Sequence, residues 1–76
     1  MTANEMFASL SYYKAEPTEP GETRYIKKFD GNITEIRISK EGYCNIRFNK
    51  KPCGADKDEI IAMAKFLQER DEENER

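Results

Sequence analysis

Residues 33–49 read ITEIRISKEGYCNIRFN, and this stretch decides the fold. Its middle, Lys40-Glu41-Gly42, is a three-residue loop with glycine last, which is the pattern of a type I turn closed by a glycine bulge. The residues on either side are rich in β-branched and aromatic side chains, which favour strands. We therefore predict an antiparallel hairpin with strands from Ile33 to Ser39 and from Tyr43 to Asn49.

The register of this hairpin follows from its apolar pattern. When Ser39 faces Tyr43, one face of the hairpin is apolar. A slip of one residue would move the whole apolar set into water, so the register is strongly specified. We expect the opposite face to gain about 0.2–1 kcal/mol from a cross-strand charge pair. The predicted pairs are Ile38–Cys44, Ile36–Ile46 and Thr34–Phe48 on the apolar face, and Arg37–Asn45 and the charge pair Glu35–Arg47 on the other.

The chain before the hairpin adds one strand and leaves one segment ambiguous. Residues 24–29 read as a strand, and Asp30-Gly31 suits a tight hairpin turn because glycine accepts positive φ freely. The meander therefore covers 24–49. Residues 15–23 hold two prolines and a glycine and are predicted to form an acidic loop. Residues 6–14 fit both a strand and a helix, and their serine and tyrosine content favours the strand.

The chain after the hairpin predicts one helix. Pro52-Cys53-Gly54 ends the strand, and Asp56 with Glu59 has the spacing of an N-cap and its capping-box partner. The helix is expected over 56–70, and residues 71–76 are expected to be a frayed acidic tail. Four apolar residues recur at the spacing of one helical face and should cover the sheet: Ile60, Met63, Ala64 and Leu67.

These elements predict a single α+β domain of 76 residues, with a three- or four-stranded antiparallel meander and one C-terminal helix packed on one face. Apolar residues make up 37% of the chain, and so thin a core is often supplemented by a dimer interface. The aromatic residues Phe7, Tyr12 and Tyr13 either complete the core or form a homodimer or partner interface. The predicted core comprises Ile36, Ile38, Cys44, Ile46, Phe48, Ile60, Met63, Ala64 and Leu67.

The residue types present argue against catalysis. The chain has no histidine, the commonest general base near neutral pH, and it has no glycine-rich phosphate loop. Cys44 and Cys53 cannot supply the four ligands of a structural zinc site. We therefore predict a protein without enzymatic activity, cofactor or bound metal.

Composition also predicts where the protein acts. The longest purely apolar stretch, residues 60–64, is too short to span a bilayer, and the first residues lack the pattern of a signal peptide. The few cysteines fit free thiols in a reducing compartment. We expect a cytoplasmic location and no membrane partner.

Charge is unevenly distributed along the chain. Residues 1–23 carry a net charge of −3, residues 24–51 of +5 and residues 52–76 of −4. A turn-stabilised hairpin presents its side chains at little ordering cost, and Arg and Tyr are enriched in binding hot spots. We therefore predict that partners bind to the basic hairpin rather than to the acidic tail. The predicted partner-binding residues are Arg37, Lys40, Tyr43, Arg47, Lys50 and Lys51.

These observations predict a non-enzymatic regulatory or inhibitory protein that binds another protein, since segregated charge steers association. The alternative is a single-stranded nucleic-acid-binding protein, in which the basic hairpin grips phosphates and Tyr43 stacks on a base. A third interpretation is that the basic side chains only keep the sheet soluble and blunt its edges.

Two resemblances bear on this choice. With residues 6–14 as a strand, the order is four strands and a helix, which with a basic sheet resembles the dimeric single-stranded-DNA-binding transcriptional coactivators. In size, charge and lack of a catalytic site, the chain is similar to small accessory proteins of phages, including inhibitors of host defence nucleases. The first resemblance implies nucleic-acid binding, and the second implies inhibition of a nucleic-acid-processing or defence complex.

Overall fold

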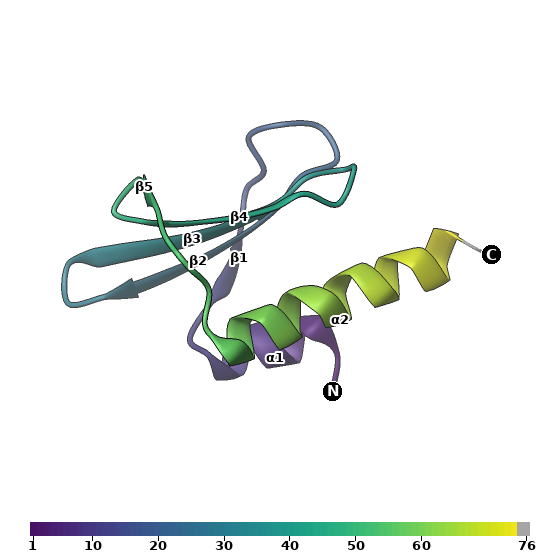
Figure 1. Ribbon diagram of the computed structural model, residues 1–76, viewed down its shortest axis with the longest axis horizontal. Helices are drawn as coiled ribbons and strands as arrows, with labels where there is room; N and C mark the ends of the chain where they lie inside the picture. The colour runs from purple at the N-terminus through teal and green to yellow at the C-terminus, as the bar shows by residue number, and fades with distance from the viewer. Residues whose placement is uncertain (75–76) are drawn as a thin grey trace.

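The computed structural model of the protein describes residues 1–74 (Figure 1). Two helices and five strands follow one another in the order α1, β1 to β5, α2. The elements are α1 (Ala3–Ser9), β1 (Tyr13–Ala15), β2 (Thr23–Phe29), β3 (Asn32–Ile38), β4 (Cys44–Phe48), β5 (Lys51–Pro52) and α2 (Lys57–Asn74).

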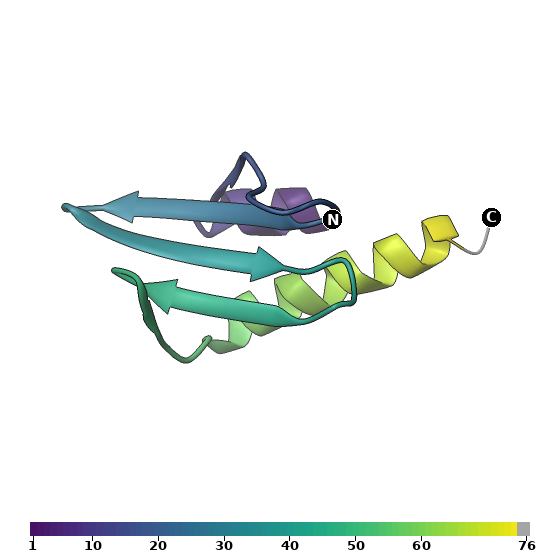
Figure 2. The same ribbon diagram turned by 90° about the horizontal axis from the view of Figure 1, so that it is seen from above.

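The five strands form one antiparallel sheet in which each strand pairs with its neighbours in sequence. Both helices lie on the same face of this sheet (Figure 1 and Figure 2). We call this the helix face and the opposite side the outer face. The end of the sheet that carries the β2–β3 turn extends beyond both helices, so its helix face is left uncovered (Figure 1).

The central hairpin has the predicted register. Ile38 faces Cys44, Ile36 faces Ile46, and Thr34 faces Phe48. Arg37–Asn45 and Glu35–Arg47 are opposed on the outer face, also as predicted. The expected Glu35–Arg47 charge pair is replaced, however, because the Glu35 carboxylate accepts a hydrogen bond from Arg24 Nε of β2 at 2.8 Å.

The ambiguous residues 6–14 divide between two elements. The strand that the composition favoured forms only at its end, in β1, and the first part belongs to α1. A capping box starts α1, in which the Glu5 N–H donates to Thr2 Oγ1 and the Thr2 N–H donates to Glu5 Oε1. The layout of four strands and a helix is therefore not observed, and the likeness to the coactivators in element order is lost.

The N-terminal aromatics complete the core. Phe7 is fully buried and stacks on Tyr25 of β2 with ring centroids 4.0 Å apart, and Tyr12 meets Phe7 edge-on at 6.0 Å. Phe7 and Tyr12 are thus unavailable to a partner, whereas Tyr13 is half-exposed on the outer face. Two of the three aromatic residues of the predicted dimer interface are therefore part of the core.

The predicted face of α2 was wrong by one residue. Glu59, Ala62 and Met63 are buried, while Ile60 is 54% exposed and Ala64 is exposed. One residue corresponds to a rotation of about 100° around a helix. α1 packs beside α2 and covers part of its apolar surface. The observed rotation of α2 also brings Glu59 to Tyr12, whose hydroxyl donates a hydrogen bond to the Glu59 carboxylate.

Two strand residues of the predicted core are also exposed. Phe48 is 45% exposed because the end of β4 extends beyond the helices. Cys44 is exposed at the start of β4, where β5 does not reach, because β5 pairs only with Arg47 and Phe48. Of the other predicted core residues, Ile36, Ile38 and Met63 are buried, and Ile46 and Leu67 pack against the core.

The capping box of α2 forms as predicted, but the helix is longer than expected. The Glu59 N–H donates to Asp56 Oδ1 and the Asp56 N–H donates to Glu59 Oε1, both at 2.8 Å. α2 continues to Asn74, so residues 71–74 of the expected frayed tail are helical. The last two residues of that tail lie outside the described residues.

Candidate interaction surface

The six predicted binding residues do not form one cluster. Lys40 and Tyr43 lie at the β3–β4 turn, whereas Lys50 and Lys51 lie beyond the other end of β4. The five residues of β4 separate these groups by about 15 Å, at the usual rise of a strand. The hairpin therefore presents two basic ends rather than one basic surface.

Two of the predicted residues also hold the acidic loop in place. Arg37 Nε donates to Glu22 Oε2 at 2.9 Å, and its Nη2 donates to the Thr18 hydroxyl. Lys40 packs its side chain against Gly21, where an added Cβ would lie 2.9 Å from the Lys40 Cβ. Residues 15–23 therefore neutralise part of the basic charge of the hairpin, which was predicted to bind a partner.

The structure places Arg47 and Lys50 in a shallow groove on the outer face. This groove has a volume of about 440 Å³. Within residues 1–74, Lys28, Arg47 and Lys50 form no ion pair, whereas Arg24 is paired with Glu35. The groove is lined by Arg24, Ile26, Lys28, Ile33, Glu35, Arg47, Asn49 and Lys50.

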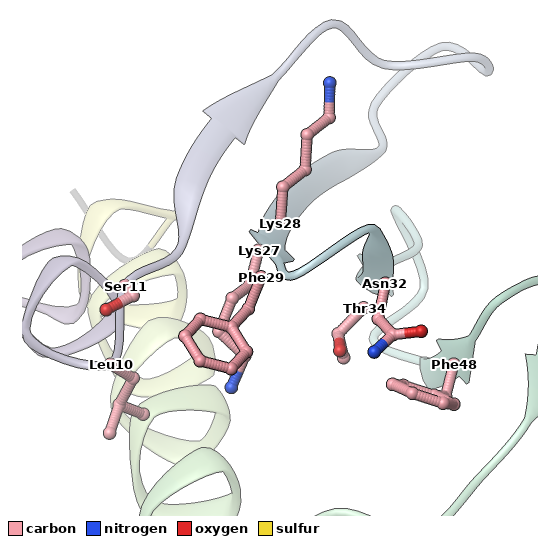
Figure 3. Close-up of a pocket in the computed structure, with 8 residues that line it drawn as sticks. All are labelled: Leu10, Ser11, Lys27, Lys28, Phe29, Asn32, Thr34 and Phe48. Atoms are coloured by element: carbon pink, nitrogen blue, oxygen red, sulfur yellow. The ribbon is translucent and has the colours of Figure 1, made fainter.

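A second hollow lies on the helix face of the same sheet end, and we call it the aromatic cleft. Its volume is about 550 Å³. Phe29 is 76% exposed beside it, and Figure 3 shows the Phe29 ring pointing into the space between Leu10 and Phe48. Among the described residues, no carboxylate lines it. Its residues are Leu10, Ser11, Lys27, Lys28, Phe29, Asn32, Thr34 and Phe48.

The strand alternation and the short α1 together create this cleft. Successive side chains of a strand point to opposite faces, so Lys27 and Phe29 share the face of buried Tyr25. On that face, Phe7 of α1 packs against Tyr25. Because α1 ends at Ser9, only Leu10 lies beside the next part of β2, at the aromatic cleft. The helix face beyond this point therefore stays open.

The two hollows lie back to back on one structural unit. We define the sheet end as residues 27–33 together with residues 48–51. It carries three exposed large apolar side chains, four lysines and a single carboxylate. These are Phe29, Ile33 and Phe48, then Lys27, Lys28, Lys50 and Lys51, and Asp30.

Sequence reasoning found the two lysines after β4 but missed Phe29 and Ile33. A signal was present, because Phe29 and Ile33 flank the Asp30-Gly31 turn closely. Large apolar residues so near a tight turn lie at the tip of a hairpin, where a helix packed on the middle of the sheet does not cover them. The sequence pattern predicted Phe29 and Ile33 as strand residues and did not indicate that they are exposed.

The described part of the chain shows no cluster of side chains typical of metal binding. Residues 1–74 contain no group of three or more His, Cys, Asp or Glu side chains that could hold a metal ion. Cys44 and Cys53 are exposed free thiols. Neither α1 nor α2 is both long and apolar enough to cross a membrane.

Comparison with known proteins adds no assignment. No protein-family model matches the chain, and neither the curated proteins nor the solved structures compared with it gave a match.

Proposed function

We propose that this chain is a non-enzymatic, cytoplasmic binding protein that regulates or inhibits another protein by docking on it through the sheet end. The observation that carries the proposal is the exposure of Phe29 and Phe48 around the aromatic cleft, which Lys27 and Lys28 also line. Exposed apolar side chains grouped together and bordered by polar residues are typical of interaction sites. Aromatic side chains at the centre of such a patch contribute most of the binding energy in many interfaces.

Charge favours a protein partner over a nucleic acid. The whole chain has a net charge of −2 and a pI near 5.2, whereas nucleic-acid-binding domains usually have a pI above about 9. Shortly after β5 in the chain, Asp56 caps α2 and Asp58 lies in its first turn, and both add negative charge. A long polyanion would be repelled there, while a protein surface with local carboxylates would contact only the lysines.

The outer groove supports single-stranded nucleic-acid binding as a second candidate. Lys28, Arg47 and Lys50 are unpaired cations within the described residues, and Tyr13 is a half-exposed aromatic on the same face. Such a site loses affinity steeply as salt concentration rises, because bound counterions are released from the phosphates. Filter binding to single-stranded and double-stranded DNA and RNA at low salt distinguishes the candidates.

Photo-crosslinking in the source cells tests the proposed function. A photoreactive phenylalanine analogue at Phe29 should crosslink to one discrete protein, and the same analogue at Tyr43 should not. Lys27→Glu combined with Lys28→Glu should abolish the Phe29 crosslink. Crosslinks to nucleic acid at Phe29, or equal protein crosslinks at Phe29 and Tyr43, would overturn the proposal.

A further inference from the structure

The edge of β2 is open where it forms the rim of the aromatic cleft. β1 pairs only with Arg24, Tyr25 and Ile26, so within residues 1–74 no strand lies beside Lys27–Phe29 on that side. The chain turns away before β1, because Ser11 has a φ of 71° and the Tyr12 N–H donates to the Phe7 carbonyl at 2.9 Å. Three residues of β2 therefore form a free edge at the sheet end.

The backbone of Lys28 points towards this free edge. The Asn49 N–H donates to the Ile33 carbonyl at 2.8 Å, and the Ile33 N–H donates to Asn49 Oδ1, so the Ile33 backbone faces β4. In an antiparallel sheet, the backbone N–H and C=O groups of successive residues point alternately to the two sides of a strand. Those of Asn32 therefore point towards its partner Phe29, and those of Lys28 point away from β3. The Lys28 N–H and C=O are thus placed to pair with an added strand.

The side chains around this edge specify what an added strand would carry. A residue opposite Lys28 points to the outer face, where the Lys28 ammonium favours a carboxylate. The residues before and after it point to the helix face, into the aromatic cleft beside Leu10 and Phe29. The edge therefore selects a pattern of apolar, acidic and apolar residues in alternation.

We propose that the partner protein docks an extended segment of this pattern along Lys27–Phe29, adding a strand in the position that β1 leaves vacant. The proposal rests on the proposed function and names the part of the partner that is recognised. Main-chain hydrogen bonds at Lys28 give binding energy, and the cleft and the lysine give specificity, as in other cases of strand addition.

A second copy of this chain does not fit the site. Two β2 edges paired around a twofold axis would bring like charges of the sheet ends together, and like charges in opposed positions destabilise strand pairing. This repulsion favours a different protein as the occupant.

Peptide titration followed by NMR tests this inference. The probe is a synthetic peptide in which leucine and phenylalanine alternate with aspartate and glutamate. One control has the same composition with apolar and acidic residues grouped, and a second replaces the acids by lysine. The alternating peptide should shift the amide signals of Lys27–Phe29 and Phe48. At a concentration about ten times Kd it should slow hydrogen exchange of the Lys28 amide about tenfold, because only free protein exchanges.

Matched variants separate strand addition from general charge attraction. Phe29→Ala should weaken the alternating peptide about tenfold or more, as loss of a hot-spot aromatic does, while Tyr43→Ala leaves its affinity unchanged. N-methylation of the peptide backbone opposite Lys28 should weaken binding similarly. Equal binding of the grouped peptide, or shifts confined to the outer groove, would overturn the inference.

The two proposals fail in different ways. If Phe29 crosslinks to a protein in cells but the alternating peptide leaves the Lys28 amide unprotected, the sheet end binds a partner by another mode and only the strand-addition inference is wrong. If Phe29 crosslinks to no protein, the proposed function itself fails.

Discussion

The Tyr12 hydroxyl donates a hydrogen bond to the Glu59 carboxylate, and both side chains are buried. Tyr12 precedes β1, and Glu59 lies in the first turn of α2. Glu59 also caps that helix by accepting from the Asp56 N–H. One carboxylate therefore joins the N-terminal segment to the start of α2.

Tyr12→Phe should destabilise the protein by about 1–3 kcal/mol at neutral pH, because it leaves a buried Glu59 oxygen without its donor. Urea denaturation followed by circular dichroism measures the loss. Tyr43→Phe, which removes the hydroxyl of an exposed tyrosine, serves as the control and should change the free energy of unfolding little. An equal loss in both variants would show that the Tyr12–Glu59 hydrogen bond does not stabilise the fold.

Stability should also fall in alkaline solution. Burial raises the pKa of Tyr12 above its ordinary value of 10.0, and the hydrogen bond to Glu59 raises it further. Burial likewise raises the pKa of Tyr25. The unfolded chain then loses these protons near pH 10 while the folded chain keeps them. The free energy of unfolding is therefore fully retained below pH 10 and declines above it, by up to about 1.4 kcal/mol per pH unit for each group. Tyr12→Phe should reduce the slope of this decline in denaturation curves taken at successive pH values.

The acidic loop should detach from the sheet at low pH. Burial raises the pKa of Glu22, but hydrogen bonds from Thr18 and Arg37 outweigh it and hold the pKa below 4.5. A lowered pKa contributes stability that is complete above 4.5 and is lost as the pH falls through the folded-state value. Glu22→Gln should therefore make the fold less sensitive to acid than the wild type. Glu41→Gln, at an exposed turn, should behave like the wild type in acid titrations followed by circular dichroism.

The exposure of Phe29 predicts that it can be removed without loss of the fold. Phe29→Ala should change the free energy of unfolding by no more than about 0.5 kcal/mol, as is usual for surface substitutions. Phe7→Ala should cost about 3–5 kcal/mol, because Phe7 is fully buried against Tyr25. Thermal and urea denaturation of the two variants check this contrast. A large loss in Phe29→Ala would mean that its ring is part of the core.

The distal half of α2 should matter for stability, because Glu69 and Arg70 bind other segments of the chain. The Ala3 N–H donates to both Glu69 carboxylate oxygens at 3.1 Å, and Arg70 Nη1 donates to the Ser39 carbonyl at 2.8 Å. Truncation after Gln68 should therefore cost about 2 kcal/mol, since hydrogen bonds to charged groups are stronger than neutral ones. Truncation after Arg70 keeps both contacts and should cost less in the same urea experiment. If both truncations lower the free energy of unfolding equally, the loss is due to helix length and not to the contacts of Glu69 and Arg70.

The sequence by itself determined the central hairpin and the start of α2. The Lys40-Glu41-Gly42 loop and the alternating side chains of β3 and β4 predicted every observed pair, because a slip of one residue exchanges the two faces of a strand. The capping box of Asp56 and Glu59 formed as predicted, because it depends on residues three apart in the chain. These features depend on local geometry, and local geometry can be read from the sequence.

Only the tertiary structure decided the rest. Residues 6–14 were ambiguous because Met6 and Leu10 fit both periodicities, and the packing of Phe7 on Tyr25 and Tyr12 chose α1 followed by β1. The phase of α2 depended on α1, which the sequence left undecided between a strand and a helix.

The interaction surface was decided in the same way. Charge along the sequence pointed to the basic hairpin, but Glu22 balances Arg37, and Phe29 stays uncovered because the helices stop short of the sheet end. Which charged groups are balanced and which apolar groups stay uncovered depends on contacts between distant segments. Those contacts exist only once the chain has folded.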